Sequence, residues 1–116
     1  MSEVVIYHNP MCSKSQRALE LIRQAGIEPE VVPYLDVGWT AEQLRELATR
    51  AGLTVRALLR AGEPLAAEFG LLDEGLDDDR LLAAMVDHPG LVERAIVATP
   101  KGVVLARPPE RVSEVL

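Results

Sequence analysis

The sequence contains very little cysteine and histidine, the residues from which disulfides and zinc sites are built. It has one cysteine and two histidines in 116 residues, and neither a Cys-x-x-Cys pair nor a Cys/His cluster with zinc-binding spacing is present. An internal disulfide is therefore impossible, and we expect no metal site. The one thiol, Cys12, is either an inert buried residue or a reactive one.

Long apolar runs and an excess of positive charge are also missing. No stretch is apolar enough to cross a bilayer, and the first residues lack the basic segment of a secretory signal, which predicts a cytoplasmic protein without a membrane partner. The formal net charge is -6. This charge repels phosphate backbones, so we expect no nucleic-acid partner. Any bound anion then has to be held by a local cluster of positive groups.

The chain does contain enough apolar residues for a sizeable core. Hydrophobic residues make up 48% of it, and no low-complexity tract or internal repeat is visible. A chain of this length fits only one ordinary domain. We therefore predict a single domain over residues 1–116.

The first third of the chain has the pattern of a strand, a helix and a second strand. Val4–Tyr7 is a β-rich run, apolar residues then recur at helical spacing as far as Gly26, and Glu30–Tyr34 predicts another strand. A β-α-β unit implies two parallel strands joined by a right-handed crossover. This opening is typical of α/β proteins.

A helical region and a hairpin follow. Helical patterns cover residues 40–51, 55–60, 65–69 and 77–85, strand-like runs cover 95–99 and 103–106, and 110–116 predicts a terminal helix. The Pro100-Lys101-Gly102 link favours a hairpin, so the last two strands should be antiparallel. We predict a thioredoxin-like α/β fold: a four-stranded mixed β-sheet flanked by helices, with a helical insertion before the C-terminal β-hairpin.

Cys12 lies where the first strand passes into the first helix. Unpaired backbone N–H groups and the helix dipole favour negative charge there, so this position both stabilises a thiolate and attracts an anion. His8 would add positive potential, and the Ser15 hydroxyl would donate a hydrogen bond to a bound oxygen. His8 is equally well explained as a hydrogen-bonded residue at the end of a strand.

Arg60, Arg94 and Arg107 lie at the ends of predicted elements: one ends a helix, one precedes the third strand and one follows the fourth. All of them could reach one edge of the sheet. Guanidinium groups bind tetrahedral oxyanions through planar, paired donors, so together with a thiolate they would form an oxyanion site. Solvated surface arginines remain the alternative explanation.

Motifs spread over nearly the whole chain resemble the glutaredoxin-coupled arsenate reductase family in content and order. They are Tyr-His-Asn-Pro-Met-Cys-Ser-Lys-Ser at 7–15, Val-Arg-Ala-Leu-Leu-Arg at 55–60, Thr-Pro-x-Gly at 99–102 and Arg-Pro at 107–108. The resemblance implies that Cys12 is the catalytic cysteine and that His8 helps to lower its pKa. It also implies that Arg60, Arg94 and Arg107 hold the oxyanion.

The same resemblance implies a reaction that needs no metal and no tightly bound cofactor. The Cys12 thiolate attacks arsenate, glutathione or an equivalent small thiol attacks the adduct, and a glutaredoxin-type reductant resolves the resulting mixed disulfide. Arsenite is the product.

One departure from the family pattern concerns Arg94. Family members usually have a cis-proline after this arginine, whereas this chain has Ala95. A cis bond before a non-proline residue is rare, so the sequence leaves open whether this bond is cis or trans. We therefore expect the loss of Arg94 to matter less for arsenate use than in relatives, whereas the loss of Arg60 or Arg107 should weaken it strongly.

Two other functions fit a lone thiol on this fold. One is a thioredoxin-fold thiol reductase that acts on another substrate and needs no arginine cluster. The other resembles the Spx-like transcriptional regulators, which bind RNA polymerase and often carry a Cys-x-x-Cys redox switch. Ser15 stands at the second position of such a pair, which is evidence against the switch.

Overall fold

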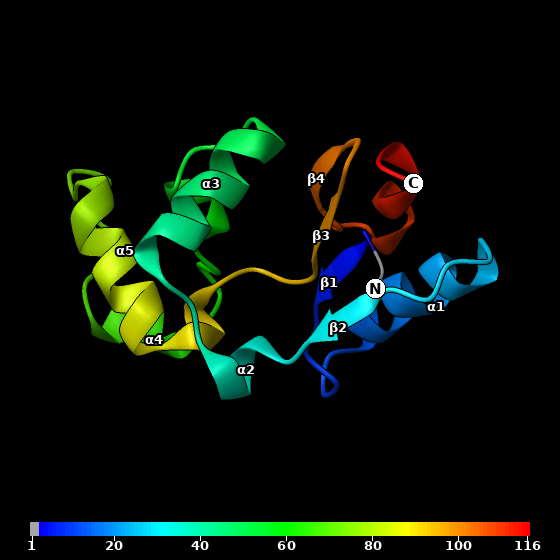
Figure 1. Cartoon of the computed structure of the whole chain (residues 1–116). Coiled ribbons are helices and arrows are strands. Elements are labelled where there is room, and N and C mark those ends of the chain that lie inside the picture. The colour runs from blue at the N-terminus through cyan, green and yellow to red at the C-terminus, as the bar shows by residue number, and fades with distance from the viewer. Residues whose placement is uncertain (1–2) are drawn as a thin grey trace. The chain divides into compact units, whose positions relative to one another are not determined.

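The computed structural model describes residues 3–116 and forms two compact units (Figure 1). One unit combines the segment that ends at Val37 with the segment from Arg94 to Leu116, and the other is Gly38–Glu93. The first contains the sheet, and the second is the helical insertion that the sequence predicts. The assignment of residues 1–116 to one domain stays a prediction.

A four-stranded mixed sheet is the centre of the first unit. Its strands are β1 (Val5–Tyr7), β2 (Glu30–Val32), β3 (Ile96–Thr99) and β4 (Gly102–Leu105), in the order β2-β1-β3-β4. β1 is parallel to β2 and antiparallel to β3, and β3 is antiparallel to β4. The mixed sheet and the C-terminal hairpin are as predicted.

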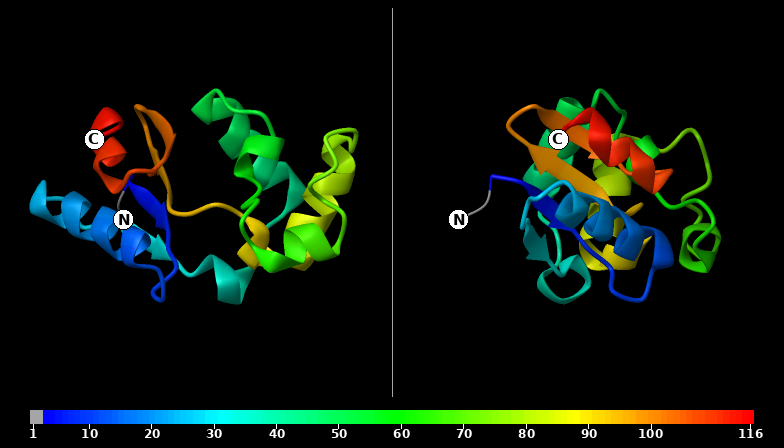
Figure 2. Two further views of the ribbon diagram at one scale, coloured as in Figure 1. Left: turned by 180° about the vertical axis from the view of Figure 1, so that it is seen from behind. Right: turned by 90° about the vertical axis from the view of Figure 1, so that its right-hand side faces the viewer.

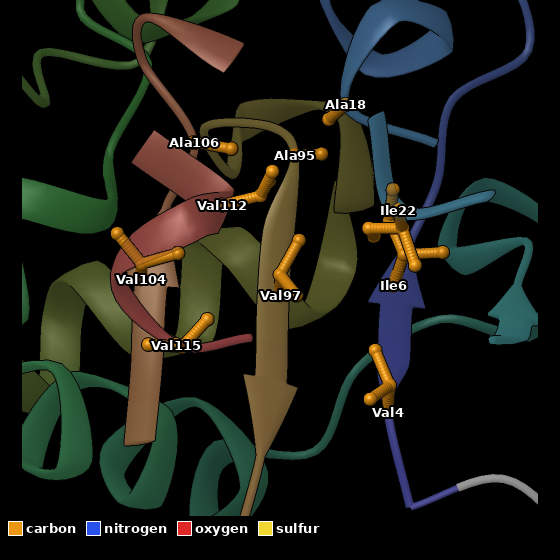
Figure 3. Packing of buried hydrophobic residues seen from close by; sticks show 10 residues of the cluster. All are labelled: Val4, Ile6, Ala18, Ile22, Ala95, Val97, Val104, Ala106, Val112 and Val115. Carbon is orange, nitrogen blue, oxygen red and sulfur yellow. The ribbon is translucent and has the colours of Figure 1, made fainter. Parts of the chain in front are cut away.

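The core of this unit lies between one face of the sheet and two helical segments. α1 (Ser13–Gln24) and the 3-10 helix η3 (Pro109–Glu114) pack against each other, and Figures 1 and 2 show them on the same face. Small and β-branched side chains fill the space between these layers (Figure 3). They are Val4, Ile6, Ala18, Ile22, Ala95, Val97, Val104, Ala106, Val112 and Val115.

The strand register brings three chain segments to one edge of the sheet. Tyr7 at the end of β1 pairs with Ile96 at the start of β3, and Ile96 pairs with Leu105 at the end of β4. The residues that follow Tyr7, precede Ile96 and follow Leu105 therefore leave the sheet at the same edge. Ala106 continues this row, because its N–H donates to the Ala95 carbonyl at 2.8 Å.

The second unit is built from helices. α3 (Ala41–Ala51) packs against α5 (Asp78–Asp87), and η1 (Arg56–Leu58), α4 (Pro64–Glu68) and η2 (Pro89–Leu91) complete it. A capping box begins α3, with the Thr40 side chain accepting from the N–H of Gln43. Gly52 ends α3 at φ 69°, the left-handed conformation that glycine adopts without strain.

Three predicted elements differ from the structure. The second strand stops at Val32, and Tyr34 begins a short helix α2 (Tyr34–Val37), because Pro33 has no N–H to continue the ladder. The predicted helix at 55–60 is only a 3-10 turn, since Leu59 is drawn into an extended bridge with Val92. The terminal helix is likewise of the 3-10 type, over Pro109–Glu114. Within residues 3–116, no helix is long and apolar enough to span a membrane.

Candidate active site

Cys12 sits on a tight turn that joins β1 to α1. The turn is held by its own backbone and side chains: the N–H of Cys12 donates to the carbonyl of Asn9 at 3.1 Å, and the N–H of Met11 donates to Oδ1 of Asn9 at 3.0 Å. The Gln16 side chain, from the first turn of α1, donates to the Pro10 carbonyl. Cys12 therefore lies on a turn that hydrogen bonds hold in place, at the sheet edge where Tyr7, Ile96 and Leu105 end the strand pairing.

The Cys12 thiol is at the N-cap of α1, and no acidic residue lies in the first turn of that helix. Partial burial raises the pKa of the thiol, but several interactions outweigh it and leave the pKa below its ordinary value. They are the backbone N–H of Ser15, a hydrogen bond from the Arg94 guanidinium, the backbone N–H of Lys14 and the positive charge of Arg94. The Cys12 side chain makes no capping hydrogen bond of its own in the structure.

His8 and Ser15 form a buried pair beneath the turn. Nδ1 of His8 shares a hydrogen bond of 2.6 Å with Oγ of Ser15, and the N–H of Asn9 donates to the same oxygen at 3.0 Å. Burial, followed by the charge of Arg23, lowers the pKa of His8 and favours the neutral imidazole. This direction opposes the positive potential that we predicted for His8, and any part that His8 takes in catalysis stays a prediction.

The role predicted for the Ser15 hydroxyl also needs correction. Ser15 is fully buried, and its oxygen already serves His8 and Asn9. The group of Ser15 that interacts with the Cys12 sulfur is the backbone N–H. Ser15 thus shapes the turn from inside, and the helix backbone supplies the donors that favour an anion.

Arg94 enters the same edge of the sheet just before β3. Its guanidinium helps to lower the pKa of the Cys12 thiol, and its Nε is buried without a hydrogen-bond partner among the described residues. The Arg94–Ala95 peptide bond, which the sequence left open, is cis.

Arg107 and Arg60 are placed differently from each other. Arg107 follows β4 at the edge that carries Cys12 and Arg94, where it is exposed and precedes a cis Pro108. Arg60 belongs to the helical unit, where its guanidinium pairs with Glu63 at 2.9 Å. The first unit therefore unites Cys12 with Arg94 and Arg107 at one edge, whereas the oxyanion-binding role of Arg60 stays a prediction.

Sequence reasoning missed the residues that brace the turn. Asn9 caps it through its side chain and its carbonyl, and Gln16 ties Pro10 to the helix. The Asn-Pro pair was a signal for this, because asparagine side chains commonly hydrogen-bond to the backbone two residues on. Among residues 3–116, no group of histidine, cysteine and carboxylate side chains could hold a metal ion.

Comparison with known proteins relates this chain to a family. The sequence model of the ArsC family matches residues 7–115. The chain belongs to the ArsC family. Arsenate reductase ArsI2 of Synechocystis is 50% identical to it over 97% of this chain and 81% of the relative. The arsenate reductase of Escherichia coli K12 is 45% identical over 100% of this chain and 82% of the relative.

The ArsC family also confirms the predicted fold. The structure of an arsenate reductase from Vibrio cholerae superimposes with a TM-score of 0.94, at 47% sequence identity and with 97% of each chain covered. The thioredoxin-like arrangement of a four-stranded mixed sheet with flanking helices is therefore confirmed.

The lowered pKa of Cys12 leads to a prediction that needs no substrate. The rate of alkylation by iodoacetamide should rise with pH about a midpoint below the ordinary thiol value of about 8.5, because the folded site favours the thiolate. The matched control is the same thiol in protein unfolded by urea, which should titrate near the ordinary value. A midpoint in folded protein at or above that of the unfolded chain would contradict an activated cysteine.

Proposed function

We propose that this ArsC family protein reduces arsenate to arsenite, with the Cys12 thiolate as nucleophile and an external thiol as reductant. The observation that carries the proposal is the meeting of Cys12 and Arg94 at one edge of the sheet: Cys12 lies at the N-terminus of α1, Arg94 precedes β3 with a buried Nε, and both the helix backbone and the guanidinium lower the pKa of the thiol. The same donors that favour the thiolate also favour a bound oxyanion. The names of the relatives in Synechocystis and E. coli agree with this substrate.

In the first step the Cys12 thiolate attacks the arsenic atom of arsenate. A sulfur–arsenic bond forms and one oxygen leaves as water after taking up protons. The nucleophile has to be the thiolate, because the thiolate and not the thiol is the reactive form of cysteine. The N–H groups at the start of α1 and the Arg94 guanidinium then neutralise negative charge that remains on the arsenic oxygens.

In the second step glutathione, or an equivalent small thiol, supplies the other sulfur. Its attack forms a disulfide between the small thiol and Cys12, and the two electrons given up by the two sulfurs reduce arsenic(V) to arsenic(III). Arsenite leaves. A glutaredoxin-type thiolate then attacks the mixed disulfide and releases Cys12 as a thiolate, a good leaving group because of its lowered pKa.

The proposed oxyanion site contains Arg94, Arg107 and Arg60. Arg94 offers a buried Nε without a hydrogen-bond partner among the described residues, so a bound oxygen would satisfy a donor that the protein does not. Arg107 comes from the same edge of the sheet. Arg60 is included because it ends the Val-Arg-Ala-Leu-Leu-Arg motif at 55–60, to which the family resemblance gives this role.

Glutathione coupling, the glutaredoxin partner and a cytoplasmic location belong to the same proposal. The chain has one cysteine, so no second internal thiol can resolve an adduct on Cys12. A glutathione pool is a property of the reducing cytoplasm, where lone reactive thiols stay reduced. The proposal therefore places the enzyme with its reductants in that compartment.

Turnover should depend on both external thiols. With arsenate, thioredoxin, thioredoxin reductase and NADPH, the protein should consume NADPH at background rate, because thioredoxin resolves disulfides between paired cysteines and this chain has no pair. Adding glutathione, glutathione reductase and a glutaredoxin should start turnover. Glutathione without glutaredoxin should support only slow turnover.

The result that contradicts this coupling is full activity with thioredoxin alone. No arsenate-dependent NADPH consumption under any reductant would contradict arsenate reduction itself. In that case, rapid reduction of another glutathione adduct would identify a general thiol reductase, and retention of RNA polymerase on immobilised protein would identify a regulator.

A further inference from the structure

Met11, next to Cys12 in the chain, is an apolar side chain left almost wholly in water. It is 89% exposed, more than any other large apolar residue that the structure describes. Single exposed apolar residues are ordinary on protein surfaces. This one is notable because of its place, immediately beside the nucleophile and on the same turn.

Hydrogen bonds within the turn hold the backbone of Met11 in place. Its N–H is bonded to Oδ1 of Asn9 at 3.0 Å, the N–H of Cys12 is bonded to the Asn9 carbonyl, and the Gln16 side chain holds Pro10. These bonds lie on both sides of Met11 in the chain. A partner that contacts Met11 therefore meets a backbone that is already ordered, which lowers the entropy cost of binding.

We infer that Met11 is the docking contact for the protein thiol that resolves the mixed disulfide on Cys12. The inference rests on the proposed function, and it commits to one partner: a small thiol–disulfide reductase with an apolar patch beside its own reactive cysteine. The chain has no second cysteine, so the attacking sulfur comes from outside. The glutathione sulfur that the partner attacks is bonded to Cys12 at about 2.05 Å, so the partner's surface is brought close to the neighbours of Cys12.

The chemistry of Met11 fits a protein partner better than the small substrates. Arsenate and glutathione are polar anions, and a thioether offers them neither a charge nor a hydrogen-bond donor. Methionine is flexible and polarisable, and it is enriched at the centres of protein interfaces. Lys14, exposed on the first turn of α1, adds a positive charge near this contact, which favours an acidic rim on the partner.

The step that Met11 serves is a thiol–disulfide exchange. The partner's thiolate attacks the glutathione sulfur of the mixed disulfide, a sulfur–sulfur bond forms between partner and glutathione, and Cys12 leaves as a thiolate. One disulfide is exchanged for another, so no further oxidant or reductant is needed. Docking at Met11 would hasten this step without altering the reactivity of Cys12 itself.

The test isolates that exchange from arsenate. The full chain is converted to its Cys12–glutathione disulfide with oxidised glutathione, and its reduction is followed by mass spectrometry with a reduced glutaredoxin or with dithiothreitol. Met11→Ser should lower the second-order rate constant with glutaredoxin about tenfold and leave that with dithiothreitol within about twofold. Met11→Leu should keep the wild-type rate, and Leu72→Ser, at an exposed apolar residue of the helical unit, serves as the control.

An unchanged glutaredoxin rate for Met11→Ser would overturn the inference, as would an equal slowing with dithiothreitol, which would assign Met11 to the reactivity of Cys12. Loss of self-association by Met11→Ser in sedimentation, with unchanged rates, would assign the residue to a second copy of this chain and would also overturn it. Because the test contains no arsenate, its result does not depend on whether the protein reduces arsenate.

Discussion

Replacing Cys12 by serine should abolish arsenate reduction, with a loss of at least about 10³-fold in the coupled assay. A hydroxyl is not ionised by the donors at the start of α1, so the sulfur–arsenic bond cannot form. Serine also cannot give up electrons to form a disulfide, so no external thiol restores turnover. NADPH consumption with glutathione and glutaredoxin measures the effect directly.

The same variant should fold normally, which separates chemistry from stability. Serine is a preferred N-cap residue, and Cys12 occupies the N-cap of α1 without a capping hydrogen bond of its own. The free energy of unfolding of Cys12→Ser should therefore equal or exceed that of the wild type near neutral pH, as measured in urea. Residual activity above one tenth of wild type would contradict Cys12 as the nucleophile.

Comparison of the two proteins across pH gives a further check. The pKa of Cys12 is lowered on folding, so its thiolate stabilises the folded state at pH values above the ordinary thiol pKa, and this contribution is lost as pH falls through the lowered value. The wild type should therefore gain stability relative to Cys12→Ser as pH rises through that interval. A gain in the opposite direction would contradict the lowered pKa.

Most of the sheet and the start of α3 were predictable because their signals are local. The Val4–Tyr7 run, the proline–glycine turn of the hairpin and the capping box of α3 at Thr40 each determine structure within a few residues. The errors arose where distant contacts decide the outcome. Leu59 is extended because it pairs with Val92, more than thirty residues away, and no pattern within 55–60 signals that pairing.

The site was predicted in its residue types but less well in the role of each residue. The position of Cys12 between a strand and a helix implied its N-terminal donors, and the structure has them. The burial of His8 and Ser15, by contrast, arises from tertiary packing. Burial lowers the pKa of His8, and it pairs the Ser15 hydroxyl with His8 inside the turn. Sequence spacing does not contain that information.

Arg94 is the residue whose expected importance changes most. From the sequence we expect its loss to matter less than in relatives, because Ala95 leaves its direction open. In the structure the Arg94 guanidinium lowers the pKa of Cys12 and has a buried Nε that is unpaired among residues 3–116, so we expect Arg94→Ala to have the strongest effect among the arginines. Loss of one oxyanion donor costs about 2.7–4 kcal/mol of transition-state stabilisation, which is about 10²–10³-fold in turnover. Arg45→Ala and Arg80→Ala, on α3 and α5, should stay within about twofold.

Arg94 acts on both the thiol and the oxyanion, and one measurement can separate the two. Arg94→Ala should raise the alkylation midpoint of Cys12, because it removes a hydrogen bond and a positive charge that favour the thiolate. At a pH above the midpoints of both proteins the thiol is ionised in each, so any remaining deficit in arsenate turnover reports on the oxyanion alone. Arg94→Lys should recover part of the midpoint shift but little of that deficit, because an ammonium keeps the charge and loses the planar, paired donors. If the turnover deficit of Arg94→Ala vanishes at high pH, Arg94 acts only by activating Cys12. If the deficit is no larger than that of Arg45→Ala, there is no dedicated oxyanion site at Arg94.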